Sequence, residues 1–288
     1  MLGALVIAFS AILVDLADVS PAAAAVFRCL YALPVLGAIA LWEDRRYGRR
    51  TWAERRLALP AGLFFAVDLI AWHHAIRDVG AGLATVLGNL QVVVVPFLAL
   101  AVLGERVPRR ILLALPLVCF GVVLVSGALE SGAYGADPSR GVLYGIVTGL
   151  TYAAFLLVQR QGSRDLRRPA GPLFDMSLVA TVAAAAYAAA LGDGDLVPAW
   201  PSAGWLLVLA LTSQVLGWLL ITVSLPRLPA AMTSLTLTIQ PIGSVLLGAI
   251  LLGQDPSLLQ LAGVACILAG LLSAALRRPA RYAAAAAE

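Results

Sequence analysis

The sequence predicts an all-α membrane protein in which ten transmembrane helices form two inverted five-helix repeats around a central cavity. Three observations lead to this prediction. The 288-residue chain is 61% hydrophobic and only 12% charged, whereas a soluble domain carries about 25% charged residues. Apolar runs near the ~20 residues that cross a bilayer recur along its length. One stretch of the chain also occurs twice, with opposite charge at the matching turn.

Ten apolar segments are separated by prolines, glycines and charged residues. Backbone groups in lipid must be paired within the protein, so only helices and closed barrels cross a bilayer. These runs are too long and alternate too little to be barrel strands. Each is therefore expected to be a helix. The expected helices cover residues 2–17, 22–42, 57–76, 81–103, 110–128, 141–159, 173–191, 203–224, 230–252 and 258–276.

The arginines set the orientation of these spans. The chain has 20 arginines and no lysine, and 17 of them fall in segments on the side that holds both termini. Only Arg77 and Arg140 fall on the other side, and Arg28 lies within a span. Because arginine-rich loops stay in the cytoplasm, we expect both termini to be cytoplasmic. The net charge of +4 then reflects anchoring at the lipid bilayer, and no nucleic acid is expected as a partner.

The repeated stretch predicts the inversion. The turn after Gly104 holds three arginines, and the turn after Gly253 holds none. Inverted copies are typical of transporters whose halves rock around a site at the bilayer midplane. We expect a first repeat at 1–128, a periplasmic linker at 129–140, a second repeat at 141–278 and a tail at 279–288. A shift of 149 positions aligns Thr85 with Ser234, Asn89 with Thr238 and Gln91 with Gln240.

Short motifs add a family resemblance. The Leu-Gly-Glu-Arg turn at 103–106 closes the fourth span, Ser20-Pro21 leads to Phe27-Arg28 in the second, and Leu-Thr-Ile-Gln-Pro at 237–241 lies in the ninth. With the topology, these motifs resemble the EamA family of the drug/metabolite transporter superfamily. The chain departs from the family at Gly253-Gln254-Asp255, where Gly-Glu is frequent, and in a first helix without the usual tryptophan-glycine pair.

The resemblance implies export of small metabolites, often amino acids, across the bacterial inner membrane. The general shape is closest to bacterial exporters of aromatic amino acids, and the motifs do not separate these from threonine and homoserine exporters. A broad-specificity drug/metabolite exporter or a nucleotide-sugar-like exchanger is the alternative. The sequence leaves the direction of transport and coupling to protons open. Two fused halves make a monomer sufficient.

Polar and aromatic residues within the spans are candidates for binding substrate. Residues four apart share a helix face, as in the matched pairs of the fourth and ninth spans. In the eighth span Gln214, Trp218 and Thr222 form a stripe that matches Phe65, Leu69 and His73 in the third. The alternative role is hydrogen bonding or packing between helices. The candidates are Thr85, Asn89, Gln91, His73, Gln214, Trp218, Thr222, Ser234, Thr238 and Gln240.

Arg28 and Asp68 are charged residues inside expected spans, where ionisable groups face a cavity or a partner. Arg28 could form a structural ion pair with Asp68, Asp15 or Asp18. Asp68 could instead hold a substrate ammonium group or a coupling proton. Trp72, near a span end, is expected at the membrane interface.

An enzyme is a remote alternative, as is a receptor. The sequence contains no H-E-x-x-H zinc motif, no G-x-S-x-G elbow and no phosphate-binding glycine loop. No catalytic residue, metal site or cofactor is therefore expected. The three cysteines all lie in apolar runs and are read as small buried side chains. The leading hypothesis is a secondary transporter that binds a small metabolite between its halves and works by alternating access.

Overall fold

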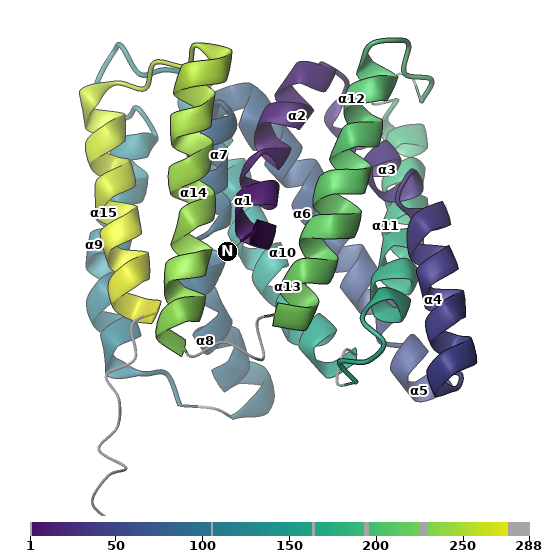
Figure 1. The fold of residues 1–288 in the computed structure, drawn as a ribbon. Coiled ribbons are helices and arrows are strands. Elements are labelled where there is room, and N and C mark those ends of the chain that lie inside the picture. Colours follow the sequence, from purple (N-terminus) through teal and green to yellow (C-terminus); the bar gives the residue numbers. More distant parts are fainter. Residues whose placement is uncertain (1, 105, 163–164, 193–195, 225–229, 276–288) are drawn as a thin grey trace, which may run out of the picture.

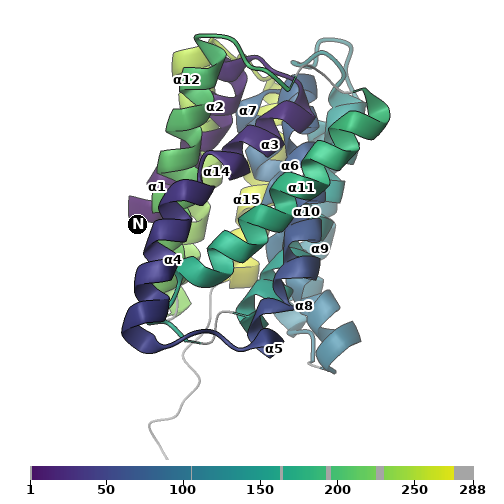
Figure 2. The ribbon, with the colours of Figure 1, turned by 90° about the vertical axis from the view of Figure 1, so that its right-hand side faces the viewer.

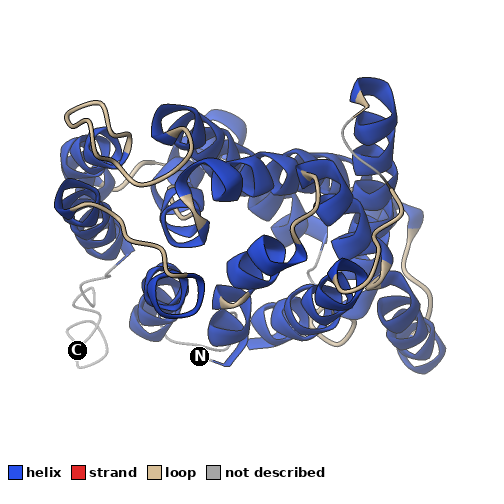
Figure 3. Cartoon of the chain, turned by 90° about the horizontal axis from the view of Figure 1, so that it is seen from above, coloured by secondary structure: helices blue, strands red, loops and turns tan. Residues whose placement is uncertain are grey.

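The computed structural model describes residues 2–104, 106–162, 165–192, 196–224 and 230–275. Within these ranges it leaves out the side chains of Leu2, Ala4, Leu103, Arg160, Ser224, Ala275 and residues 230–239. The regular secondary structure of the described residues is helical, without strands (Figure 3). The helices run side by side in one bundle (Figure 1). The predicted all-α class is confirmed.

Helix occupies every range that was expected to form a span. The helices of the N-terminal half are α1 Leu2–Ala8, α2 Ser10–Ala17, α3 Pro21–Leu30, α4 Leu33–Tyr47, α5 Trp52–Arg55, α6 Ala58–Val79, α7 Ala81–Gly88, α8 Gln91–Leu103 and α9 Arg109–Val125. Those of the C-terminal half are α10 Pro138–Gly162, α11 Ala170–Leu191, α12 Ser202–Leu209, the π-helix η1 Ala210–Gly217, α13 Trp218–Ser224, α14 Ala230–Leu252 and α15 Leu258–Ala275.

Six helical stretches of the described chain are long and apolar enough to cross a membrane. Shorter apolar helices lie at Leu5–Ala17, Gln240–Leu252 and Leu258–Ala274. Large apolar side chains are exposed on the outside of the bundle, for example Leu113, Val102 and Ile250. An outer surface of this kind suits contact with lipid tails. The chain is a multi-pass membrane protein. The six stretches are Pro21–Tyr47, Trp52–Val79, Ala81–Val102, Pro138–Gln159, Ala170–Leu191 and Ser202–Val223.

Four of the expected spans are not continuous α-helices. The first is interrupted at Phe9, the second between Leu30 and Leu33, and the fourth between Gly88 and Gln91. The eighth contains the π-helix η1. Pro34 interrupts the second span. Its nitrogen carries no hydrogen to donate to the carbonyl four residues earlier, and its ring collides with that carbonyl. Broken helices leave backbone groups free, which membrane proteins tolerate where they face other helices or a cavity.

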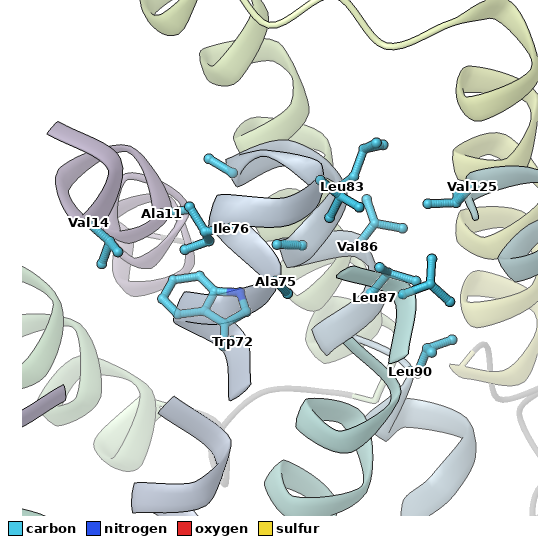
Figure 4. Close-up of a cluster of buried hydrophobic side chains, with 14 of the residues drawn as sticks. Ala11, Val14, Trp72, Ala75, Ile76, Leu83, Val86, Leu87, Leu90 and Val125 are labelled. Carbon is cyan, nitrogen blue, oxygen red and sulfur yellow. The ribbon is translucent and has the colours of Figure 1, made fainter. Parts of the chain in front are cut away.

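Two groups of buried apolar side chains hold the bundle together. Figure 4 shows part of the first group, in which Trp72 and Ile76 of α6 lie near Ala11 of α2, and Leu83 and Leu87 belong to the neighbouring α7. The second group is centred on aromatic and long apolar side chains of α6, α10 and α11, which pack on α3. Figure 2 shows α11 lying obliquely across the bundle. Both groups surround the space in which the candidate site lies.

Glycines let α9 and α15 approach closely. A Cβ atom built on Gly121 would lie 2.7 Å from the carbonyl oxygen of Gly263 and 2.8 Å from Cγ1 of Ile267. A Cβ atom on Gly263 would lie 2.7 Å from the carbonyl oxygen of Gly121. Small residues allow such backbone contact between helices in membranes, where van der Waals packing replaces the hydrophobic effect.

Polar contacts fasten the bundle at the end that holds residues 126–137. The buried carboxylate of Asp78 on α6 accepts from Nε of Arg140 at 2.8 Å. The buried amide of Gln260 on α15 accepts from the backbone N–H of Tyr134 at 2.9 Å and donates to its carbonyl at 2.9 Å. Gln254 accepts from the N–H of Gly82 at 3.3 Å. The bonds of Asp78 and Gln260 tie the segment between the two halves to α6 and α15, and the bond of Gln254 joins the turn after α14 to α7.

Candidate functional site

A cavity lies inside the bundle where several helices are broken. Its volume is ≈ 70 Å³, counted as the space open to the centre of a water-sized sphere. The N-terminal half contributes Ser10, Arg28, Phe65, Asp68, Trp72 and Asn89, among others. The C-terminal half contributes Thr148, Tyr152, Trp218 and Gln240.

Arg28 is a buried cation at the wall of this cavity. It lies near the end of α3, just before the break, and only 3% of it is exposed. Its Nε donates to Oε1 of Gln214 at 3.0 Å, and Nε2 of Gln214 donates to Oγ of Ser177 at 3.1 Å. The guanidinium carbon lies 5.7 Å from the centre of the Trp72 ring, within range of a cation–π interaction. The guanidinium is thus held from two sides by neutral groups.

Asp68 is a buried acidic residue at the wall of the same cavity, with 6% of it exposed. Its carboxylate has no hydrogen bond and no ion pair within 4.0 Å among the residues that the structure describes. The suggested pairing of Arg28 with Asp68, Asp15 or Asp18 is therefore wrong for this structure. The amide of Gln214 takes the place of a carboxylate beside the Arg28 guanidinium, and Arg28 and Asp68 are not in contact with each other.

Three aromatic side chains of the cavity wall, Phe65, Tyr152 and Trp218, pack on one another and on Phe155 behind them. The ring centres of Phe65 and Phe155 are 4.8 Å apart, and those of Phe65 and Trp218 are 5.9 Å apart, edge to face. Tyr152 stacks on Phe155 at 5.9 Å and meets Trp218 at 6.2 Å. The indole Nε1 of Trp218 and the Oγ1 of Thr148 are buried without hydrogen-bond partners in the described chain. Both residues line the cavity, so its wall is aromatic with unsatisfied polar atoms.

The broken fourth span brings Thr85 and Asn89 to the cavity. The hydroxyl of Thr85 donates to the carbonyl of Ala81 at 2.8 Å, and Nδ2 of Asn89 donates to the carbonyl of Thr85 at 2.8 Å. Each residue therefore bonds its own helix with one donor. The Oδ1 atom of Asn89 makes no hydrogen bond to the described residues and is an acceptor available to a ligand.

The structure brings together half of the twelve residues singled out from the sequence. Gln214 lies behind the cavity wall, where it holds Arg28. Gln91 is buried away from the cavity, and Thr222 is half-buried outside it. Ser234 and Thr238 lie in α14, and their side chains are outside those that the structure describes. The cavity is lined by Arg28, Asp68, Thr85, Asn89, Trp218 and Gln240.

His73 faces another part of the molecule. Its Nδ1 lies 3.1 Å from the carbonyl oxygen of Pro21, at the start of α3. It lines a second pocket of ≈ 50 Å³ together with Asp15, Asp18 and Arg77. The stripe of Phe65, Leu69 and His73 therefore reaches the central cavity only through its first two members.

The stripe of Gln214, Trp218 and Thr222 is also divided. Residues four apart share a face in an α-helix with 3.6 residues per turn. The π-helix η1 has a wider turn and covers the start of this stripe, so the residues of the stripe do not share one face. The prediction that Trp72 lies at the membrane interface is also wrong. The residue lies two turns from the end of α6, yet it is 9% exposed and lines the cavity beneath Arg28 instead of facing the membrane interface.

The sequence reading missed Thr148 and Tyr152 on α10. They are four positions apart and so share a helix face, in a segment with few other polar side chains. This spacing of two polar side chains could have identified the cavity-facing side of α10. The described residues contain no group of three or more His, Cys, Asp or Glu side chains placed to hold a metal ion.

Comparison with known proteins assigns this arrangement to a family. Residues 1–127 and 139–276 match the EamA-like transporter family. A curated protein of Archaeoglobus fulgidus, described as an uncharacterized transporter, is 27% identical over 226 residues, which is 76% of each chain. A protein of known crystal structure superposes on 94% of this chain and 96% of its own with a TM-score of 0.57. At 18% identity, that likeness concerns the fold alone.

Proposed function

The chain belongs to the EamA-like transporter family and is a membrane transporter, not an enzyme, and we propose that it exports small metabolites by alternating access. The proposed substrates are amino acids, aromatic or otherwise neutral. The proposed location is the bacterial inner membrane, with both termini in the cytoplasm. The cavity between the two family-matched segments carries this proposal, because it combines a buried arginine and a buried aspartate with aromatic rings.

The proposed architecture is ten crossings in two inverted halves, residues 1–128 and 141–278. The distribution of arginine supports the orientation, with 17 of 20 on the side of both termini. Part of the helix packing supports a twofold relation between the halves. Exchanging the five spans of one half for those of the other, in order, turns the packing of α6 on α10 into that of α2 on α12 and of α1 on η1. The same exchange leaves three further pairs unchanged, which are α3 and α4 with α11, α7 with α14, and α9 with α15. The packing of α6 on α11, by contrast, exchanges into the weaker packing of α3 on α12 and η1.

The cavity is the proposed substrate site. It lies where the α1–α2, α3–α4 and α7–α8 breaks meet α10 and the start of α13, the kind of place in which inverted-repeat transporters bind substrate. Rocking of one half against the other would enlarge it toward one side at a time. A monomer contains the whole cavity.

Counterflow in proteoliposomes tests this function. Vesicles containing the purified protein and loaded with an unlabelled solute are diluted into the same labelled solute, using a panel of amino acids, purines and organic cations at two pH values. A carrier accumulates label transiently and with saturation, and we expect this for amino acids. Counterflow of purines or organic cations alone would favour the broad-specificity or nucleotide-sugar-like exchanger. Conductance without saturation or counterflow would reject the carrier.

A further inference from the structure

We infer that Arg28 and Asp68 bind the two ends of a zwitterionic substrate, the carboxylate at Arg28 and the ammonium at Asp68. The inference rests on the proposed carrier function and specifies what its cavity recognises. The substrate class is the free amino acid with both α-groups charged and an aromatic or apolar side chain. Amines and carboxylic acids with the same side chain lack one of the two charges and are expected to bind poorly.

The first step is the unpaired state of both charges. Arg28 and Asp68 are buried in one cavity, yet no ion pair within 4.0 Å joins them. A buried charge without a partner is costly in a protein and costly in a membrane. A purely structural pair would be expected in contact, which would reduce that cost. Two separated charges of opposite sign instead suit a ligand that carries both signs.

The second step is the way Arg28 is held. Nε is bonded to the neutral amide of Gln214, and the ring of Trp72 lies beneath the guanidinium. Neither contact supplies a negative charge. The terminal nitrogens of the guanidinium make no hydrogen bond to the described residues, although Arg28 lines the cavity. A planar guanidinium held in this way is suited to two parallel hydrogen bonds with a carboxylate.

The third step concerns Asp68 and its surroundings. Phe65, Leu69 and Trp72 of the same helix line the cavity beside it. A carboxylate among aromatic faces favours an ammonium group, which gains both an ion pair and cation–π attraction. Arg28 and Asp68 belong to α3 and α6, which pack against each other. The two α-groups of one small molecule can therefore lie between neighbouring helices.

The fourth step places the side chain of the substrate. The rings of Phe65, Tyr152 and Trp218 pack together in the cavity wall. They offer stacking surface to an aromatic ring. The orphan Nε1 of Trp218 and Oγ1 of Thr148 lie in the same wall and leave polar atoms for a substrate or water to satisfy. The complete cavity thus matches a zwitterion with an aromatic side chain.

Three molecules with one ring and different charges test the inference. Wild-type protein is reconstituted in proteoliposomes loaded with phenylalanine, and counterflow of labelled phenylalanine is measured against three competitors: phenylalanine, phenethylamine and 3-phenylpropionate. Each single-charge analogue is expected to need at least about tenfold more than phenylalanine for half-inhibition, because it leaves one buried charge unpaired. Equal competition by either analogue would overturn the inference.

The failure of this inference is distinguishable from failure of the carrier function. Counterflow of a purine or an organic cation, without counterflow of phenylalanine, leaves a working carrier and overturns the zwitterion. Absence of counterflow for the whole panel rejects both. These measurements need only the wild-type protein, so they hold even where a variant does not fold.

Two substitutions separate recognition from structural support. The ratio of interest is the half-inhibiting concentration of an analogue divided by that of phenylalanine. Asp68→Asn is expected to lower this ratio for 3-phenylpropionate, and Arg28→Gln is expected to lower it for phenethylamine. A merely structural role would weaken all three competitors together. Asp175→Asn is the matched control, because this carboxylate pairs with Arg50 at 2.8 Å outside the cavity. An unshifted ratio in Asp68→Asn, in protein that still transports phenylalanine, would show that Asp68 does not bind the ammonium group.

Discussion

The guanidinium of Arg28 and the side-chain amide of Gln214 are joined by a buried hydrogen bond of 3.0 Å across 186 positions of the sequence. The bond links α3 to the π-helix η1, and so connects the two segments that match the family. Gln214 also bonds Ser177 on α11. The neutral side chain of Gln214 therefore connects the guanidinium of Arg28 to η1 and α11 of the other half.

Gln214→Leu is expected to destabilise the folded protein. It leaves the Nε of Arg28 buried without an acceptor, and a hydrogen bond to a charged group contributes about 1.5–3 kcal/mol. The measurement is denaturant unfolding in detergent micelles. Ser177→Ala is the control, because it removes only the second bond and keeps Arg28 paired with Gln214. Equal loss of stability in both variants would show that the Arg28 bond has no special weight.

Trp218→Ala is expected to lower the rate of transport while the protein still inserts into the membrane. The substitution removes one wall of the cavity and the contacts of the indole with Phe65 and Tyr152. Membrane-fraction abundance and counterflow are measured together. Trp42→Ala is the control, because Trp42 is 59% exposed and lies outside the cavity. A wild-type rate in Trp218→Ala would remove this residue from the site.

Gln240→Ala is expected to reduce transport severalfold with little change in abundance. Gln240 lines the cavity from α14, and its amide makes no hydrogen bond to the described residues. It can therefore bond a substrate or water that contacts one. Counterflow at several substrate concentrations separates a loss of affinity from a loss of rate. The exposed Gln161 provides the control as Gln161→Ala. Identical kinetics in both variants would contradict a role for Gln240.

Gly121→Ala is expected to destabilise the contact of α9 with α15. The new methyl group would lie 2.7 Å from the carbonyl oxygen of Gly263, and forcing backbones apart in a packed interface costs about 1–3 kcal/mol. Thermal unfolding in detergent measures the effect. Gly132→Ala is the control, since a Cβ atom there meets nothing within 4 Å. Equal melting temperatures for the two variants would show that α9 and α15 are not tightly packed in solution.

Much of the fold could be predicted because the bilayer imposes a simple pattern. The apolar run that became α14 was predicted as 230–252 and forms Ala230–Leu252, because breakers bound it on both sides. The interruptions at Phe9 and Asn89 could not be predicted in this way. They lie inside continuous apolar runs, and the backbone continues through them by local turns, such as the bond from the N–H of Asn89 to the carbonyl of Val86 at 3.2 Å, so no breaker in the sequence marks them.

The site could be predicted only in part, for a related reason. Helical spacing identifies which residues share a face, and two of the residues it singled out, Trp218 and Gln240, line the cavity. It does not identify a partner far along the chain, so Gln214 looked like a ligand-binding residue and not a support for Arg28. Trp72 was misread because closeness to a span end does not determine which side of the helix faces the bundle.

The central claim is that the cavity opens alternately to the two sides of the membrane, and labelling of one cysteine tests it most directly. Thr148→Cys is introduced after Cys29, Cys119 and Cys266 are replaced by alanine, and a membrane-impermeant maleimide is added to right-side-out or inside-out vesicles. Thr148 lines the cavity with its hydroxyl unpartnered among the described residues. Ser139→Cys, exposed at the start of α10, is the one-sided control. The account predicts labelling of Thr148→Cys from both sides, slowed by substrate; labelling from one side alone under every condition would contradict it.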